Sequence, residues 1–379
     1  MKKKKYDISR TSIKEYTKLK LWALSAGRCE ICNALLYKDN SHGFDGNFSN
    51  IAHIIGVGED GPRSSEDLGD EKNKYENLML LCPTCHHEID TKVDYFQKNY
   101  LAGLKYEHEK RVEFLTGIDS NKECQIVTYL MNVNEAVKQY SSLKSMLLAV
   151  ADFKMFPKQN SLIDLCDDAG VKYVHSKQTI IEKSRELEIQ FNKTIKQFTK
   201  DSLAVFAFTC QPLLFKLGTL LGDQREVVVF QPQRDSLKNR WSFDLNEGKI
   251  AYITKRKYSS KFHKVALVLD LSAEIKDGRI ESVLGKDVNI YHITINNPNR
   301  LFVTSLSIQN GFVETFRKCL ENIKRENELV DEIHIFPAMP VSLAIRAGMD
   351  RMPKVDPKWI IYEQSNVNEG FYETLTIGE

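Results

Sequence analysis

The chain has 379 residues, of which 42% are hydrophobic, 27% charged and 10% aromatic. This length fits two or three domains of roughly 100–200 residues each, and the composition excludes a mostly disordered or fibrous chain. No stretch approaches the roughly 18 consecutive apolar residues that a membrane-spanning helix needs. The amino-terminal MKKKKYDISR has no apolar run behind its lysines, so we expect a soluble, cytoplasmic protein with no signal peptide and no membrane partner.

The net charge of +2 is unevenly distributed. Residues 1–28 contain nine lysines and arginines against two acidic residues. An excess of seven positive charges suits a polyanion such as nucleic acid, because each phosphate contact releases counterions. A solubilising tail explains the Lys2–Lys5 run equally well, so charge alone does not decide whether the partner is DNA.

Four of the eight cysteines form two C-x-x-C pairs, Cys29/Cys32 and Cys82/Cys85. Two such knuckles are a standard tetrahedral arrangement for a structural Zn²⁺, because each tight turn presents two thiolates to one ion. The 49 residues between the pairs (33–81) exceed the gap of a simple zinc ribbon, so an insertion separates the knuckles. Unrelated core cysteines and a redox C-x-x-C are the alternatives. The remaining cysteines predict inert, buried side chains: Cys124, Cys166, Cys210 and Cys319.

The insertion contains a short strand-like run, NIAHIIG (50–56), that carries His53. A polar, glycine-rich stretch (56–73) predicts a loop and is followed by NLMLLCPTCHHEID (77–90). Pro83 suits the first turn of a helix. On that helix His86 and Asp90 are four residues apart, so they share one face and can bind the same ion. His87 follows at about 100° around the helix and is expected to face solvent.

A histidine on a strand, an asparagine before the second knuckle and a histidine on the following helix resemble the HNH endonucleases of the ββα-metal type, over roughly residues 20–115. The resemblance implies that His53 is the general base and that Asn77 holds the His53 loop in orientation. It implies that His86, with Asp90, binds a catalytic divalent ion such as Mg²⁺. The four paired cysteines would hold the separate zinc. Many relatives have a further metal ligand just before the base, where this chain has Ala52.

Beyond residue 117 the pattern changes. Residues 124–153 have helical apolar spacing, which predicts a helical linker within 118–154 between a domain at 1–117 and one at 155–379. From 155 onward, strand-like runs alternate with helical ones, which indicates an α/β domain with mainly parallel, buried strands. The expected strands are 203–208, 226–231, 264–271, 288–295, 331–336 and 358–363, and the expected helices lie near 178–200, 212–222, 309–327 and 340–349.

A weak internal repeat relates residues 204–231 to 332–364. Each copy has a strand, a turn ending in proline (Pro212 or Pro340), a helix and a second aliphatic strand. Two tandem units predict a pseudo-two-fold domain with a cleft near the strand ends, where open α/β sheets bind ligands. Coincidence between two generic α/β hairpins is the alternative. No G-x-G-x-x-G follows a strand and no P-loop is present.

The segments VALVLDLSAEI, HIFPAMPVSLAIRAG and WIIYEQ, in this order after the HNH-like region, resemble the HNH–SAVED effectors of bacterial CBASS anti-phage systems. SAVED domains are similar to two fused CARF-like Rossmann units. The resemblance therefore implies an α+β, zinc-stapled nuclease domain followed by an α/β sensor of cyclic di- or trinucleotides. The implied activity is ligand-triggered, non-specific cleavage of double-stranded DNA.

Pocket residues follow only from position near the predicted strand ends and helix starts. A cyclic oligonucleotide needs donors for its phosphates and flat faces for its bases. The candidates are Gln211, Lys216, Arg234, Asp270, Ser272, Met339, Arg346 and Trp359.

We also expect a homo-oligomer, a dimer that assembles further when ligand binds. Two other classes stay open. One is an HNH restriction endonuclease whose carboxyl-terminal domain reads DNA directly. The other is a zinc protein that binds DNA without cleaving it.

Overall fold

The computed structural model describes residues 13–39, 42–57, 61–64, 69–131, 142–166, 176–198, 200–233, 240–241, 248–258, 264–327, 329–364 and 370–378. The basic run Lys2–Lys5 therefore lies outside the described residues. The chain divides into two compact units, Met1–Ile118 and Asp119–Glu379. Among the described residues, none of the helices combines the length and the apolar character needed to cross a bilayer.

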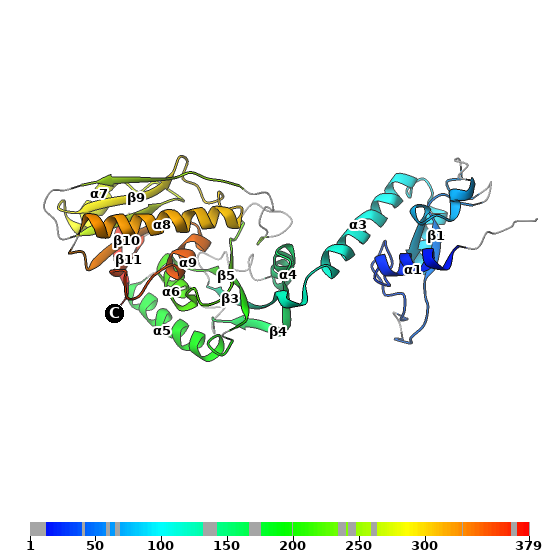
Figure 1. Ribbon diagram of the computed structural model, residues 1–379, viewed down its shortest axis with the longest axis horizontal. Helices are drawn as coiled ribbons and strands as arrows, with labels where there is room; N and C mark the ends of the chain where they lie inside the picture. Colours follow the sequence, from blue (N-terminus) through cyan, green and yellow to red (C-terminus); the bar gives the residue numbers. More distant parts are fainter. Residues whose placement is uncertain are drawn as a thin grey trace, which may run out of the picture. The chain divides into compact units, whose positions relative to one another are not determined.

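The first unit is small and contains one two-stranded sheet with helices around it (Figure 1). Strands β1 and β2 pair antiparallel, with Asn50 opposite Leu81 and His53 opposite Leu78. Helix α2 starts directly after β2, because Pro83 occupies its first turn and Cys82 caps it. The elements are α1 (Glu15–Leu24), β1 (Asn50–His53), η1 (Gly69–Asn73), η2 (Tyr75–Asn77), β2 (Leu78–Leu81), α2 (Pro83–Thr91) and α3 (Lys98–Thr116).

The core of this unit forms around β2, all four residues of which are buried. Leu80 and Leu81 share a cluster with Ile89 of α2 and Leu101 of α3. Cys29 and Cys85 are buried in the same cluster. The two cysteine pairs are thus part of the unit's small hydrophobic core, and the strand–strand–helix order expected from the sequence is present.

The described part of the second unit has two sheets. The four-stranded sheet has the order β4-β3-β5-β6 and is parallel throughout. The six-stranded sheet has the order β12-β11-β10-β8-β9-β7, with only its edge strands β12 and β7 antiparallel. The strands are β3 (Glu123–Leu130), β4 (Phe156–Asp164), β5 (Ser202–Phe208), β6 (Val227–Phe230), β7 (Tyr252–Lys257), β8 (Val265–Asp270), β9 (Asn289–Ile295), β10 (Glu332–Ala338), β11 (Lys358–Gln364) and β12 (Phe371–Ile377).

The prediction of a helical linker within 118–154 is wrong for the first half of that segment. Residues 123–130 form β3, a strand in the interior of the four-stranded sheet, and only Leu143–Asp152 form a helix (α4). Seven of the eight residues of β3 are buried. A strand buried on both faces is apolar almost continuously, so its pattern resembles that of a buried helix.

With β3 in place, the internal repeat is longer than the sequence indicated. The first copy runs β3-α4-β4-α5-β5-α6-β6, and the second runs β8-α7-β9-α8-β10-α9-β11. In both sheets the corresponding strands lie in the same order, β4-β3-β5-β6 and β9-β8-β10-β11. The helices are α5 (Lys177–Thr194), α6 (Gln211–Leu221), α7 (Asp277–Leu284), α8 (Leu306–Glu326) and α9 (Val341–Met349), and a short η3 (Ser120–Lys122) precedes β3. The predicted pair of α/β units is present.

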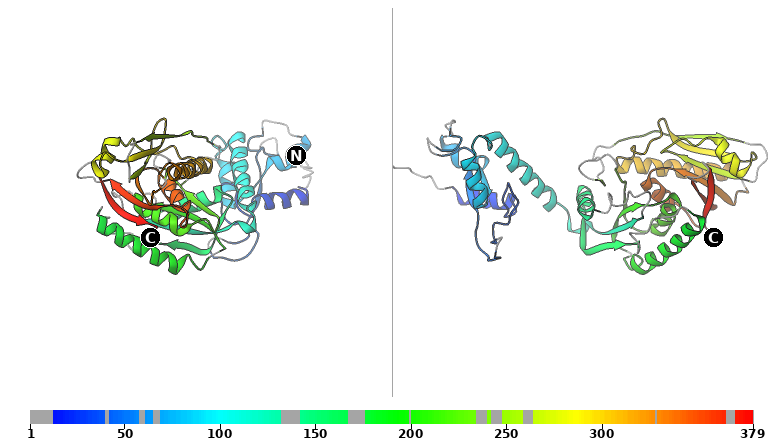
Figure 2. Two further views of the ribbon diagram at one scale, coloured as in Figure 1. Left: turned by 60° about the vertical axis from the view of Figure 1, so that its left-hand side comes forward. Right: turned by 180° about the vertical axis from the view of Figure 1, so that it is seen from behind.

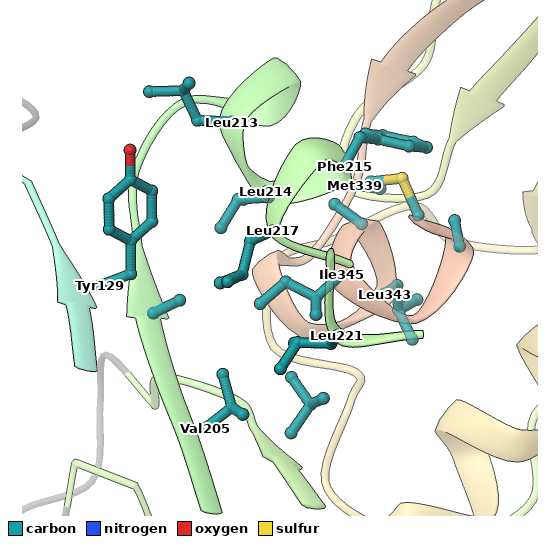
Figure 3. Close-up of a cluster of buried hydrophobic side chains, with 14 of the residues drawn as sticks. Tyr129, Val205, Leu213, Leu214, Phe215, Leu217, Leu221, Met339, Leu343 and Ile345 are labelled. Atoms are coloured by element: carbon teal, nitrogen blue, oxygen red, sulfur yellow. The ribbon is translucent and has the colours of Figure 1, made fainter. Parts of the chain in front are cut away.

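Helices α6 and α9, one from each repeat, pack against each other. Figure 3 shows the two helices side by side, with Leu217 and Leu221 of α6 close to Ile345 of α9, and all three side chains are at most 3% exposed. Both sheets contribute side chains to this same core. The pair joins the two repeats because each helix presents an apolar face that neither sheet alone could cover.

The six-stranded sheet is covered on both faces. Along β8, Leu267 and Leu269 belong to the large shared core, whereas Ala266 and Val268 pack with Ile280 of α7. Helix α8 lies on the first face, as Figure 1 shows. At one edge, β12 (red) lies beside α5 (green) in Figure 2, where Lys177 and Glu373 form an ion pair of 2.9 Å. Because both faces of this sheet are covered by apolar side chains, we expect ligand-binding polar residues at the carboxyl ends of its parallel strands.

Candidate functional sites

The four paired cysteines meet at one point in the first unit. One sulfur atom from each lies within 4.8 Å of the others. Tetrahedral Zn²⁺ with bonds of about 2.3 Å places its sulfur ligands about 3.8 Å apart. The Sγ atoms of Cys32 and Cys82, one from each knuckle, are 3.7 Å apart. The donor set, its count and its spacing therefore fit a structural zinc ion.

Local backbone geometry creates each knuckle. Asn33 follows the first pair with φ +63°, a left-handed turn that asparagine tolerates, and its N–H donates to the carbonyl of Cys29. In the second knuckle the N–H of Cys85 donates to Sγ of Cys82 at 3.4 Å, at the start of α2. These turns give each knuckle the backbone shape that presents its two thiols together.

Asn77 fastens the segment that follows β1. Its side-chain oxygen accepts from the N–H of Ile55 at 2.8 Å, and its amide donates to the carbonyls of Ile55 (3.0 Å) and Lys72 (2.9 Å). Its backbone carbonyl also accepts from the N–H of Ile54. Asn77 is 7% exposed, so these bonds are shielded from water. The chain leaving His53 is therefore held rigidly against the entry to β2.

His53 is half-buried at the end of β1, and its Nε2 lies 3.0 Å from Oδ1 of Asn73. An amide oxygen only accepts, so this contact assigns the ring proton to Nε2 and leaves the lone pair on Nδ1. The sequence did not identify Asn73, which lies in the glycine-rich insertion with no motif around it.

His86 and Asp90 lie together on α2, as their spacing predicts. Nε2 of His86 is 3.4 Å from Oδ2 of Asp90, a separation that one divalent ion could bridge. On its other side, Nδ1 of His86 is 3.0 Å from the side-chain amide of Asn50 at the start of β1. An amide nitrogen only donates, so in this arrangement Nδ1 of His86 accepts and the ring proton lies on Nε2, toward Asp90. An ion bound through Nε2 would require the Asn50 amide to turn over, so that its oxygen accepts from Nδ1–H. His87 is exposed, as expected.

Asp90 has a second neighbour, Arg63. Its guanidinium NH2 is 3.6 Å from Oδ1 of Asp90. Across the described residues, the four cysteines are the one group of three or more histidine, cysteine or acidic side chains close enough to share an ion. His86 and Asp90 are therefore a pair of donors without a third protein ligand of these types, in line with Ala52 in the position before His53.

In the second unit, Gln211 and Met339 meet between the repeats. The Gln211 side-chain amide donates to the Met339 carbonyl at 2.9 Å, and the Gln211 N–H donates to the Glu363 carboxylate at 3.2 Å. The reverse contact joins Gln231, after β6, to the N–H and hydroxyl of Ser342 at the start of α9. Each repeat thus caps a helix of the other. Burial raises the pKa of the Glu363 carboxyl to about 7.

Asp270 and Ser272 lie at the end of β8, also near the junction with β10, where the N–H of Ser272 donates to the carbonyl of Ala338. Asp270 is buried and faces His292, whose Nδ1 is 3.3 Å away, while Nε2 of His292 is 2.9 Å from Asp277. The position after a strand was the signal for Asp270. His292 carried no such signal, because it lies inside β9.

Three predicted pocket residues have other roles. Lys216 forms an ion pair with Glu188 of α5 at 2.7 Å, and Arg346 donates to Asn310 of α8. Trp359 is 0% exposed and contacts Phe215 and Phe316 edge-on, so its ring offers no exposed face to a ligand in this structure, and its ligand contact stays a prediction. The sequence alone does not show whether an aromatic residue at the start of a strand is buried or exposed. Arg234 lies outside the described residues.

A small cavity of about 20 Å³ lies at the ends of β3 and β4, below α5. Tyr129 lines it, and the Tyr129 hydroxyl is buried with no hydrogen-bond partner. A volume of this size holds one water molecule and not a nucleotide. The cavity therefore has room for a partner to the Tyr129 hydroxyl but is too small to be a nucleotide pocket.

Among solved structures, the chain is similar to Cap4 SAVED/CARF-domain receptors. It is 12% identical to that of Acinetobacter baumannii with the cyclic trinucleotide 3'3'3'-cAAA, with a TM-score of 0.40, covering 78% of this chain and 62% of that one. For the same receptor with 2'3'3'-cAAA the identity is 12% and the TM-score 0.41, and the match covers 82% of this chain and 65% of that one. For the Moraxella osloensis receptor the identity is 10% and the TM-score 0.34, and the match covers 77% of this chain and 60% of that one. The chain thus spans less than two thirds of these receptors. Among curated proteins, none matches it.

A family model is more direct. The SAVED model, described as "SMODS-associated and fused to various effectors sensor domain", matches residues 186–377, slightly more than half of the chain. The match begins within α5 and includes α6, α9 and both of their capping contacts. The chain therefore belongs to the SAVED family of sensor domains.

Proposed function

We propose that this protein is a metal-dependent endonuclease that degrades double-stranded DNA non-specifically when its SAVED domain binds a cyclic oligonucleotide, as part of cytoplasmic anti-phage defence. The observation that carries the proposal is one chain with two units. One is a SAVED sensor, and the other is a strand–strand–helix unit that presents His53, Asn77 and His86. A sensor fused to a separate compact unit calls for an output, and these residues are suited to phosphodiester hydrolysis.

Zn²⁺ has a structural role in this proposal. All four sulfur ligands come from the protein, so the ion has no open position for water or substrate. Cys29 and Cys32 precede β1, whereas Cys82 and Cys85 lie at the start of α2. The ion therefore ties the amino-terminal knuckle to the helix that carries His86.

His53 acts as general base. With the proton on Nε2 and donated to Asn73, the Nδ1 lone pair accepts a proton from the attacking water. Asn77 keeps the segment after His53 fixed, so the ring retains its direction. Asn73 and Asn77 are positioning residues, since neither contacts the reacting atoms in this proposal.

His86 and Asp90 hold the catalytic divalent ion, for which Mg²⁺ is the natural candidate because carboxylate and phosphate oxygens suit it. When bound, such an ion supplies Lewis-acid stabilisation of charge on the phosphate and the leaving oxygen. Asn50 keeps the His86 ring turned toward Asp90. Among the described residues no third histidine, cysteine or acidic donor lies close, so an ion held there would take further oxygen ligands from water or a DNA phosphate.

The ligand of the SAVED unit is proposed to be a cyclic di- or trinucleotide. The Acinetobacter baumannii receptor, which has cyclic trinucleotides bound, supplies the first compounds to try. Gln211 and Met339 lie where the two repeats meet, and Asp270 and Ser272 follow β8 beside the end of β10. Strand ends and helix starts of this kind are the usual ligand position in open α/β folds.

One ββα site cuts one strand, so a double-strand break needs two of them. Ligand binding can favour an assembly only by differential affinity for the assembled state. We therefore expect a dimer that forms larger oligomers with ligand. Light scattering with and without the activating nucleotide measures this directly, and an unchanged mass at full activity would replace assembly by intramolecular release.

The deciding experiment is plasmid degradation by the purified chain with Mg²⁺ and a panel of cyclic di- and trinucleotides that includes 3'3'3'-cAAA. We expect cleavage with one or a few members of the panel and none without nucleotide. Cleavage that needs no nucleotide would instead favour an enzyme that reads DNA directly. DNA binding without cleavage under any condition would contradict a nuclease.

A further inference from the structure

Arg63 is a buried arginine within the insertion, between β1 and β2. Its side chain is 7% exposed, although most arginines lie at the surface. Its Nε donates to the carbonyl of Ile54 at 2.6 Å, and its NH1 donates to the carbonyls of Ile89 (2.6 Å) and Phe96 (3.3 Å). The backbone at Arg63 has φ +58°, which a non-glycine residue adopts only when its surroundings require it. These contacts fix the guanidinium between the end of β1 and the end of α2.

The remaining guanidinium nitrogen, NH2, is the one that faces Asp90. It is buried, makes no hydrogen bond, and lies 3.6 Å from Oδ1 of Asp90. The other carboxylate oxygen, Oδ2, faces Nε2 of His86. Asp90 is therefore shared between a fixed positive charge on one side and the proposed ion position on the other.

Counting charges shows the consequence. The Arg63 guanidinium offsets the negative charge of the Asp90 carboxylate, so this pair offers a cation little net attraction. A divalent ion would raise the local charge to about +2 with two protein donors, and a nearby arginine repels it. A DNA phosphate would supply the missing negative charge and an oxygen ligand together.

We infer that Arg63 makes ion binding depend on DNA: it neutralises Asp90 in the free protein, so the divalent ion binds tightly only together with a phosphate of the substrate. This inference rests on the proposed function of His86 and Asp90 as ion ligands. Because binding free energies are linked, the ion must raise the affinity for DNA by the same factor as DNA raises the affinity for the ion. The free protein would then carry little bound ion, whereas the DNA complex would be loaded.

The first test needs neither DNA nor activator. Mn²⁺ is titrated calorimetrically into the zinc-loaded full chain, its Arg63→Gln variant and its Arg63→Lys variant, with His86→Ala defining the background. Glutamine keeps a donor for the Ile54 carbonyl but removes the charge, so we expect at least tenfold tighter Mn²⁺ binding. Lysine keeps the charge and should leave binding weak. Arg63→Gln protein that keeps its zinc and its melting transition but binds Mn²⁺ no more tightly overturns the inference.

The second test leaves Arg63 in place, so it can overturn the inference even if Arg63→Gln does not fold. The His53→Ala chain, which should not cleave, is titrated with Mn²⁺ with and without a DNA duplex of about 20 base pairs. The cyclic nucleotide that activates the unmodified chain is present throughout. We expect the duplex to raise the Mn²⁺ affinity at least tenfold, and equal affinities would overturn the inference. If no nucleotide activates cleavage and no Mn²⁺ binds to any form, the proposed nuclease itself fails, which is a different result.

Discussion

Gly218 of α6 and Gly348 of α9 occupy matching positions at the crossing of the two helices. A Cβ on Gly218 would lie closer than 3.0 Å to the Ile345 carbonyl oxygen, and one on Gly348 closer than 3.0 Å to that of Phe215. Each glycine therefore lets the backbone of the opposite helix come close, at the residue three positions before that helix's own glycine. Both obstacles are backbone atoms, which cannot rotate away. This reciprocal contact brings the two repeats together, so an added side chain there should destabilise the second unit.

Replacing Gly218 by alanine should destabilise the second unit by about 3 kcal/mol, the upper part of the usual range for overpacking. Thermal unfolding followed by circular dichroism measures it. Gly278 of α7 is the matched control, because a Cβ added there would meet no neighbouring atom within 4 Å and alanine favours a helix. Gly278→Ala should be neutral or slightly stabilising. Equal effects of the two substitutions would contradict the close crossing.

The second prediction concerns zinc. The purified chain should carry one Zn²⁺ per molecule, measured by elemental analysis after dialysis. Cys82→Ala should lose it and unfold the first unit while the second unit keeps its own transition, because a structural zinc supplies much of the folding free energy of a small domain. Cys166→Ser, outside the cluster, should retain the metal. A well-folded first unit without zinc would end this proposal.

The third prediction concerns the base. His53→Ala should reduce nucleotide-triggered DNA cleavage by at least about 10²-fold, as loss of a general base usually does. Zinc content and cyclic-nucleotide binding should not change, since His53 is none of the four clustered cysteines and belongs to the first unit, whereas the SAVED match lies in the second. His87→Ala is the control, because His87 is exposed on the helix that carries His86. Wild-type cleavage by His53→Ala protein would show that His53 is not the base.

The fourth prediction concerns pH and His292. Burial disfavours its charged ring, but the hydrogen bonds and charges of Asp270 and Asp277 outweigh burial and raise the pKa of His292. A raised folded-state pKa gives stability that is complete below the unfolded pKa of about 6.5 and is lost as the pH rises through the folded value. The difference in melting temperature between wild type and His292→Gln should therefore shrink as the pH rises above 6.5. Lys257, which also faces Asp277, stays charged over this range.

His334 gives a contrast of opposite sign. Burial, followed by the charge of Lys264, lowers the pKa of His334. Its neutral ring therefore stabilises the fold fully above a pH of about 6.5, and that contribution is lost as the pH falls. The His334→Gln comparison should show a difference that shrinks toward acid pH. The same pH trend for both variants would contradict the assignment of the two environments.

The fifth prediction separates two residues of α6 that the sequence could not distinguish. Gln211→Ala should weaken binding of the activating cyclic nucleotide about tenfold, because Gln211 lies at the junction of the repeats beside Met339 and Glu363. Lys216→Ala should leave binding unchanged, because Lys216 is paired with Glu188 on α5. Isothermal titration calorimetry measures both affinities. A larger loss for Lys216→Ala would place the ligand elsewhere on the helix.

Much of the first unit was determined by the sequence alone, because its signals are local. The C-x-x-C spacing predicts turns that present two thiols, and Pro83 marks the start of α2. The i, i+4 spacing of His86 and Asp90 then places both on one helix face. In the second unit, aliphatic runs predicted β5, β6, β8, β9, β10 and β11, but not β3 or β4. The matching order of β5-α6-β6 and β10-α9-β11 was visible for the same reason.

Other features were decided only by the tertiary structure. β3 is a strand because β4 and β5 pair with it on both sides, and a run that is buried all round has no period that separates it from a helix. Trp359 is buried, whereas exposure would have made it a ligand contact. Arg63 and Asn73 reach Asp90 and His53 across the fold from an insertion without a motif. Partners that are far apart in the sequence meet only through the way the chain folds back on itself. A single sequence does not show which of its distant residues come into contact.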